Sequence, residues 1–234
     1  MKSEIKVWRL DVKIYILKDI PLSYIQYKGA EFLDSLLSKE NEWREFHEIN
    51  CYKQYCMSGL FPLEKDGMYK KDKIYTLTVR TVDSTLAKYF AEELKNHYTD
   101  TIKGLTSEIS IIPRKIVGEL YSLTPVILKS DQGYWKNTMN ITQFEKRLFE
   151  NIIKKYNQYT GKKANESFQL YTNITFLNQK PIANEYKGIC LLGDKIHLQV
   201  ADNEMAQEMA YFMLGAGMLE MNSRGYGFCN FRWI

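Results

Sequence analysis

Residues 213–228 read MLGAGMLEMNSRGYGF and hold four of the 13 glycines in the chain, with the basic residue Arg224 among them. A helical pattern of apolar residues leads into this stretch, and a strand-like pattern over 228–234 follows it. Glycine has no Cβ and tolerates positive φ, so backbone N–H groups can crowd around an anion there. The stretch therefore predicts an anion-binding loop. A helix–strand connection that needs glycine only for its turns is the alternative.

The order of elements around the glycines argues against the common nucleotide-cofactor folds. In dinucleotide-binding folds and P-loops the glycines follow a strand and open a helix. Here they follow a helix and precede a strand. A phosphate would be bound by the loop's own amides and by Arg224.

Length and composition are those of an ordinary globular protein. The 234 residues suffice for one large domain or two small ones, and 45% of them are apolar. The net charge of +4 permits a polyanionic partner without demanding one. The 17 tyrosines fit either a core or stacking platforms for nucleobases, and the core is the commoner role.

Cysteine usage favours a reduced, cytoplasmic setting. The four cysteines form no Cys-x-x-Cys pair and have no histidine at metal-ligand spacing, so we expect no metal and no other cofactor. The N-terminus lacks the apolar stretch of a signal peptide. The most apolar run, over 209–219, is about half the length that spans a bilayer, so we expect a soluble protein without a membrane partner.

Apolar periodicity predicts the same order of elements twice. In the first half the patterns predict strands over 4–17, 51–61, 74–80 and 105–116, a helix after Pro21 and a helix capped by Asp83. This order, β-α-β-β-α-β, is that of the ferredoxin-like unit. The polar segment 39–50 is predicted as a connection.

The second half repeats the order without a detectable sequence repeat. Strands are predicted over 119–129, 169–177, 186–200 (with an interruption at Gly193-Asp194) and 228–234, with a capping box at Thr142 and Glu145 and an N-cap at Asp202. We therefore expect an α+β protein of two tandem ferredoxin-like domains, over 1–117 and 118–234. No low-complexity linker separates them, so they should pack against each other.

Three histidines are candidates for acid–base chemistry. His97 closes a predicted helix and is expected to be a solvated residue that complements the helix dipole. His197 lies in a predicted strand and is expected to point outward in a structural role. His47 lies in the polar connection, and Lys53 follows six residues later. Because loops carry chemistry more often than strand faces do, His47 is the preferred candidate.

At these residues the chain resembles a known family. Asn222-Ser-Arg-Gly-Tyr-Gly-Phe228 is similar to the Asn-Ser-x-Gly-Phe-Gly signature of the RAMP superfamily of CRISPR systems. His47 and Lys53 resemble, at matching separation, the catalytic histidine and lysine of its CRISPR-associated repeat-processing endoribonucleases (the sixth Cas family). Leu123-Thr-Pro-Val126 is similar to the segment that opens the family's second domain. The resemblance covers essentially the whole chain.

The resemblance implies metal-independent cleavage of precursor CRISPR RNA within its repeat, by attack of a ribose 2′-OH. The products would be a 2′,3′-cyclic phosphate and a 5′-OH. His47 would act as general base or general acid, and Lys53 would stabilise the developing charge. Some members add a tyrosine where this chain has Phe32, and Tyr27 is the candidate that replaces it.

The same resemblance implies a set of RNA contacts and leaves two other functions open. The RNA backbone would be bound by Gly215, Gly217, Arg224, Gly225, Gly227 and Lys115. A non-cleaving RAMP subunit of a CRISPR effector complex would share the fold and the glycine loop, and a ferredoxin-like regulatory module would bind a small ligand instead. The implied partners are CRISPR repeat RNA and, in addition, effector-complex subunits; monomer and homodimer both fit the sequence.

Overall fold

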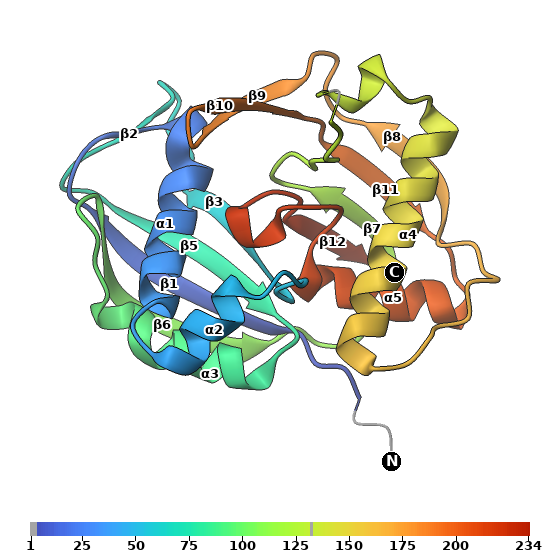
Figure 1. Ribbon diagram of the computed structural model, residues 1–234, viewed down its shortest axis with the longest axis horizontal. Helices are drawn as coiled ribbons and strands as arrows, with labels where there is room; N and C mark the ends of the chain where they lie inside the picture. Colours follow the sequence, from blue (N-terminus) through green and yellow to red (C-terminus); the bar gives the residue numbers. More distant parts are fainter. Residues whose placement is uncertain (1–3, 132) are drawn as a thin grey trace.

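The computed structural model describes residues 4–131 and 133–234. Its two halves form two α+β domains that lie side by side, the first in blue to green and the second in yellow to red (Figure 1). Over the described residues, each domain is built on a four-stranded antiparallel sheet. The predicted α+β class with tandem ferredoxin-like domains is confirmed. The domain boundary near Val117 stays a prediction, and the second sheet starts at this residue.

The first sheet has the strand order β3-β5-β1-β6, which is the ferredoxin-like order. Its apolar side is covered by α1 and α3, whose buried residues recur at helical spacing. The bounds are β1 Trp8–Ile16, α1 Ile25–Leu37, β3 Tyr55–Phe61, β5 Ile74–Thr81, α3 Ser84–Glu93 and β6 Ile102–Ile111. A short pair, β2 Ile20–Pro21 with β4 Met68–Tyr69, joins two connections at the edge of this domain.

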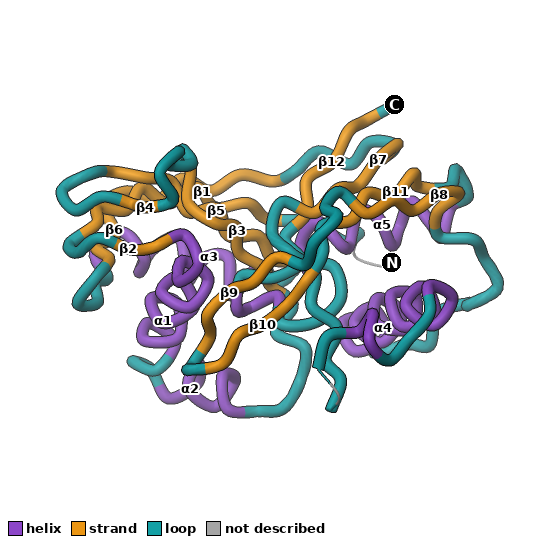
Figure 2. The backbone as a smooth tube through the Cα atoms, turned by 90° about the horizontal axis from the view of Figure 1, so that it is seen from above, coloured by secondary structure: helices purple, strands orange, loops and turns teal. Residues whose placement is uncertain are grey.

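The second sheet has the matching order β12-β7-β11-β8, with α4 and α5 as its helices. An additional hairpin, β9-β10, extends from this domain toward α1 (Figure 1). The bounds are β7 Val117–Ser122, α4 Ile141–Thr160, β8 Tyr171–Phe176, β9 Ile182–Tyr186, β10 Ile189–Gly193, β11 Ile196–Val200, α5 Glu204–Ala216 and β12 Cys229–Trp233. Seen from above, the two sheets lie along one side of the molecule, and α1, α2 and α4 lie along the other (Figure 2).

The prediction of a connection over 39–50 is wrong, because this segment contains helix α2, Asn41–Glu48. Trp43 alone among its residues is buried, and it stacks on Tyr89 with ring centroids 4.9 Å apart. A single buried position cannot produce the apolar periodicity by which a helix is recognised. His47 therefore lies in the last turn of a helix, and β3 starts at Tyr55, after Lys53.

The interruption predicted at Gly193-Asp194 is confirmed, because β10 ends at Gly193 and β11 starts at Ile196, but the turn within 186–193 was not predicted. The segment contains the end of β9, all of β10 and all of β11. Lys187 and Gly188 make the β9-β10 turn, with φ of 50° and 79°. Two successive positive φ values are typical of a tight two-residue hairpin turn, which is usually recognised by Asn-Gly or Asp-Gly. This turn was not predicted because lysine occupies the first of the two positions.

Helix caps show how local the sequence signals are. The cap predicted at Asp83 is confirmed, because its carboxylate accepts hydrogen bonds from the N–H groups of Thr85 and Leu86. The caps predicted for the second domain are shifted. The observed caps are Asn140 with Gln143 for α4 and Asn203 for α5, in place of Thr142 with Glu145 and Asp202.

His97 is not a solvated residue, contrary to the prediction. Its side chain is buried, with Nε2 2.7 Å from the Ser35 hydroxyl and the ring 5.0 Å from that of Phe32. Burial lowers the pKa of His97 to about 4, so the imidazole is neutral at pH 7 and packs as a core residue.

Buried polar contacts hold the two domains together. The Tyr211 hydroxyl on α5 donates to the Ile112 carbonyl at 2.6 Å and accepts from the Val7 N–H at 3.2 Å. The guanidinium of Arg80 on β5 donates to the Cys229 carbonyl on β12 at 2.7 Å. Because such bonds depend on direction, they fix how the domains sit and hence the shape of the space between them.

Replacing Tyr211 with phenylalanine should lower the free energy of unfolding by about 1–3 kcal/mol, because two buried backbone groups lose their partner. Denaturant unfolding followed by circular dichroism measures this. Tyr98→Phe is the control, since Tyr98 is 70% exposed and its loss should change little. Equal stability of the two variants would contradict this role of Tyr211.

Candidate active site

A cavity of about 680 Å³ lies between the two domains. From the first domain it is lined by residues 47–55, and from the second by α4, the segment 220–224 and Tyr186. The cavity contains His47, Lys53 and Arg224 together, although they are far apart in the sequence. The structure therefore brings together three of the residues that were singled out from the sequence.

His47 points from the end of α2 toward α1. Its Nδ1 lies 3.5 Å from Oδ1 of Asp34, and its side chain is 23% exposed. Asp34 was not identified from the sequence, because a lone aspartate on an amphipathic helix looks like any solvated charge. The imidazole thus lies at the cavity wall, between the last turn of α2 and the Asp34 carboxylate.

Arg224 approaches the same carboxylate from the second domain. It lies in the 3₁₀ turn Asn222–Arg224, and its guanidinium forms an ion pair with Oδ2 of Asp34. Both side chains are 21% exposed. Ion pairs that are this shielded are screened less by salt than surface pairs. Arg224 therefore joins the glycine-rich loop to α1.

Lys53 lies across the C-terminal end of α2. Its Nζ donates to the carbonyls of Phe46 and Ile49, the latter at 2.5 Å, and lies 3.9 Å from the Cys51 sulfur. A cation is favoured at a helix C-terminus, where carbonyls lack partners. Partial burial lowers the pKa of Lys53. The ammonium group is thereby held at the carbonyl of Phe46, the residue that precedes His47.

The loop glycines have conformational and packing roles. Gly217, Gly225 and Gly227 have φ of 76°, 87° and 64°, and a Cβ on Gly227 would lie 2.0 Å from the Met218 carbonyl oxygen. Gly215 belongs to α5, where a Cβ would lie 2.8 Å from Val82. Side chains at these positions would therefore disrupt the loop or its packing.

The amides of the loop glycines are already in use. Gly217, Gly225 and Gly227 donate their N–H groups to the carbonyls of Met213, Asn222 and Pro125 at 2.8–3.1 Å. This corrects the expectation that these amides bind an anion directly. The glycines shape the loop and place Arg224, and they supply no free donors at these three positions.

Lys155 was missed in the sequence and holds this loop from below. Its buried Nζ donates to the carbonyls of Gly217 (2.8 Å) and Leu219 (2.6 Å) and to the side-chain oxygen of Asn222 (2.5 Å). The Asn222 amide in turn donates to the carbonyls of Met218 and Tyr226. Burial lowers the pKa of Lys155 to about 7. Lys155 lies three residues after Ile152, on the apolar face of α4. A lysine at an apolar position of an amphipathic helix is the sequence signal by which this buried residue could have been found.

The remaining predicted residues lie outside the cavity. Tyr27 packs edge-on against Tyr186, with ring centroids 5.8 Å apart, and lines a separate hollow of about 240 Å³. Phe32, at the position where some relatives have tyrosine, is fully buried. Lys115 is exposed on the connection between β6 and β7.

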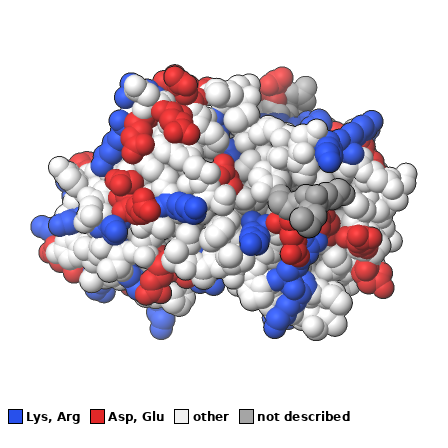
Figure 3. All heavy atoms as spheres, turned by 90° about the horizontal axis from the view of Figure 1, so that it is seen from below, with Lys and Arg blue, Asp and Glu red and all other residues white. Residues whose placement is uncertain are grey.

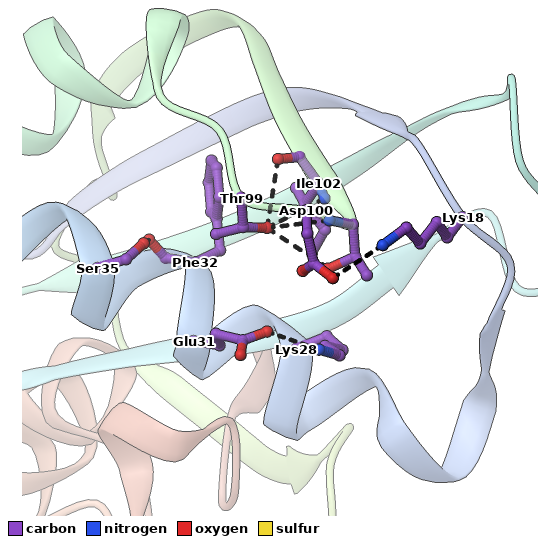
Figure 4. Close-up of polar contacts among 9 residues, drawn as sticks. Lys18, Lys28, Glu31, Phe32, Ser35, Thr99, Asp100 and Ile102 are labelled. Atoms are coloured by element: carbon purple, nitrogen blue, oxygen red, sulfur yellow. Dashed lines mark hydrogen bonds and ion pairs between the residues drawn. The ribbon is translucent and has the colours of Figure 1, made fainter.

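Charges on the outer surface are mostly mixed in sign. On the face drawn in Figure 3, basic and acidic side chains are interspersed. Near the N-terminal half of α1, Lys18 pairs with Asp100 at 3.0 Å and Lys28 with Glu31 at 2.7 Å (Figure 4). The cavity differs, because its lining includes Lys53, Lys129, Lys155 and Arg224 against the acidic residues Glu48 and Glu220. Basic side chains therefore outnumber acidic ones in the lining of the cavity.

Residues 111–231 match the family model described as CRISPR associated protein Cas6, C-terminal. The chain belongs to the Cas6 family. It is similar to CRISPR-associated endoribonuclease Cas6 2 of Methanocaldococcus jannaschii, with 22% identity over 217 residues that cover 85% of this chain and 88% of that protein.

Solved structures show the same fold over nearly the full length of this Cas6-family chain. A structure described as CRISPR associated protein Cas6 superimposes with a TM-score of 0.71 at 17% identity, covering 97% of this chain and 99% of the other. One described as an RAMP protein binding different RNA substrates has a TM-score of 0.69 at 16% identity, covering 96% and 99%.

Over 4–131 and 133–234, no group of three or more His, Cys, Asp or Glu side chains is placed to hold a metal ion. In the same part of the chain, no helix combines the length and apolarity needed to cross a membrane.

The pKa of Lys155 should make stability depend on pH. Between about 7 and the ordinary lysine value of 10.5, the unfolded chain binds a proton that the folded chain lacks. Raising the pH through this window should therefore stabilise the wild type relative to Lys155→Met, by up to about 1.4 kcal/mol per pH unit. Denaturant unfolding at several pH values measures this.

The neighbouring Lys154→Met is the matched control, because the Lys154 side chain is 65% exposed on the same helix. Its stability should follow the wild type at every pH. Parallel curves for the wild type and Lys155→Met would show that the buried ammonium keeps an ordinary pKa.

Proposed function

We propose that this protein is an endoribonuclease that cuts precursor CRISPR RNA within its repeat to give guide RNA. The observation that carries the proposal is the meeting of His47 and Lys53 with Arg224 in one cavity between the domains. Basic side chains predominate in the cavity lining, which suits a phosphodiester. Membership in the Cas6 family and the endoribonuclease named in M. jannaschii support CRISPR RNA as the substrate.

The reaction that fits these side chains is an internal transesterification. The ribose 2′-oxygen forms a bond to the adjacent phosphorus while the bond from phosphorus to the 5′-oxygen breaks. One proton leaves the 2′-OH and one reaches the 5′-oxygen, so the products are a 2′,3′-cyclic phosphate and a 5′-OH. The imidazole of His47 can accept or donate a proton, and it serves one of the two proton transfers.

Lys53 would stabilise the negative charge that builds up on the phosphorane oxygens. The Lys53 ammonium group donates to carbonyls at the end of α2, and partial burial lowers its pKa. Because a phosphate oxygen is negatively charged, it would be a stronger acceptor for the same donor. The 2′-OH is a reactant, so DNA of the same sequence cannot be cut.

We propose that the reaction needs no metal ion. Of the two acidic residues in the cavity, Glu220 is paired with Arg147 at 3.0 Å and also accepts from the Lys129 N–H at 2.9 Å. Proton transfer and charge stabilisation are assigned to His47 and Lys53, which replace the functions that metal ions serve in two-metal nucleases.

Replacing His47 with alanine should lower the cleavage rate of repeat RNA by about 10²–10⁴-fold, the usual contribution of one acid–base group. Single-turnover cleavage of labelled RNA measures this. His197→Ala is the control, because His197 lies on β11 and contacts Glu119 at 3.2 Å, outside the cavity. Wild-type cleavage by His47→Ala would refute the assignment, and a wild type that binds but never cuts would favour the non-cleaving RAMP subunit.

Cleavage should persist in EDTA and stop when the nucleotide 5′ to the scissile phosphate carries 2′-deoxyribose. The first result follows from metal-free proton transfer, and the second from the loss of the attacking oxygen. The deoxy RNA should still bind, which a filter-binding assay can verify. Loss of activity in EDTA that added Mg²⁺ restores would contradict the proposed mechanism.

A further inference from the structure

The contacts of Asp34 assign it a role in the proposed reaction. We infer that Asp34 is a positioning residue: it holds the His47 imidazole with Nδ1 toward α1 and Nε2 toward the bound RNA, and Arg224 of the second domain holds Asp34. This inference rests on the proposed function, because it concerns the same histidine. It adds a residue that neither the family signature nor the sequence pattern identifies.

The two oxygens of the Asp34 carboxylate have different neighbours. Oδ2 forms the ion pair with Arg224. Oδ1 is buried and faces Nδ1 of His47 at 3.5 Å. Among the residues that the structure describes, Oδ1 has no hydrogen-bond partner. A buried carboxylate oxygen without a donor is costly, so a small approach of the imidazole N–H would satisfy it.

The chemistry of a carboxylate then selects one form of the histidine. An ionised carboxylate only accepts hydrogen bonds, so the nitrogen that faces it must carry a proton. Neutral His47 therefore has its proton on Nδ1 and its lone pair on Nε2. That lone pair can take the proton of the 2′-OH, and the imidazolium form can donate from the same atom. Either role in catalysis uses the orientation that Asp34 sets.

Arg224 links this arrangement to the second domain. The loop that carries Arg224 is fixed by the buried Lys155 ammonium through Gly217, Leu219 and Asn222. Arg224 then fixes one oxygen of Asp34 and leaves the other for His47. The glycine-rich stretch thus acts on the histidine of the other domain through one carboxylate.

A simple interdomain ion pair is the competing explanation. In that case the loss of Asp34 would lower stability but would leave the chemistry of His47 unchanged. The two explanations differ in the pH dependence of the reaction, which a structural ion pair does not set. The charged groups nearest to His47 are Asp34 on α1 and its partner Arg224 on the loop. The other titratable groups that line the cavity with His47 include Glu48 in α2, Lys53 after α2, Tyr55 on β3 and Tyr186 on β9.

The test is Asp34→Asn, which keeps the size of the side chain and removes its charge. We expect kcat for repeat-RNA cleavage to fall about 10- to 10²-fold, a part of the 10²–10⁴-fold that one acid–base group contributes, with KM nearly unchanged. The limb of the pH–rate profile that reports His47 should move to lower pH, because a neutral amide no longer stabilises the imidazolium. An unchanged kcat and an unchanged profile would overturn the inference.

Glu31→Gln is the matched control. Glu31 lies on the same helix one turn earlier and forms an ion pair with Lys28 at 2.7 Å. The control removes a carboxylate from α1 that pairs with Lys28 and not with Arg224 or His47, so its kcat and pH profile should equal those of the wild type. An equal loss of activity in both variants would attribute the effect to α1 in general and overturn the role of Asp34.

A second measurement does not depend on cleavage or on the folding of a variant. Nitrogen-15 NMR of the RNA-free wild type at a pH where His47 is neutral should show a protonated Nδ1 and an unprotonated Nε2. The opposite tautomer would overturn the inference even if the protein cuts RNA. Conversely, the expected tautomer in a protein that never cuts RNA would leave the Asp34–His47 contact intact and reject the proposed function.

Discussion

The buried ammonium of Lys155 is the interaction on which the rest of the site depends. A charge removed from water is costly unless hydrogen bonds replace its hydration, and here loop oxygens from Ala216, Gly217, Leu219 and Asn222 do so. The same bonds hold the loop in a conformation that only glycine permits at several positions. The loop presents Arg224 to Asp34, and Asp34 faces His47. A continuous series of contacts thereby connects one lysine of the second domain with the histidine of the first domain.

The loop therefore has a different role from the one that its composition suggests. Glycines with a neighbouring arginine predict an anion site built from free amides, but three of the four glycine amides donate to carbonyls of the protein itself. The arginine is engaged by a carboxylate across the domain boundary. The signature motif shapes the wall of an interdomain cavity, and the positive charge available to a phosphate comes from the lysines in that wall.

The fold could be predicted from the sequence because strand alternation and helix spacing are local signals, and two rounds of them gave the ferredoxin-like order. His47 and Lys53, which were selected by their spacing in the sequence, both line the cavity between the domains. Helix α2 was missed because Trp43 is its single buried residue, and the β9-β10 turn because lysine occupies a positive-φ position. Asp34 and Lys155 were missed for a different reason. Their roles arise from contacts over 13 to 190 positions of the chain, which no local pattern records.

If RNA is cut in the cavity between the domains, a structure of the protein bound to repeat RNA will show the scissile phosphate there. The RNA should carry 2′-deoxyribose 5′ to the scissile phosphate so that it stays intact. We expect the scissile phosphate between His47 and Lys53, with the 2′ carbon toward Nε2 of the histidine. RNA bound across the open faces of the two sheets, with the cavity left empty, would contradict this expectation.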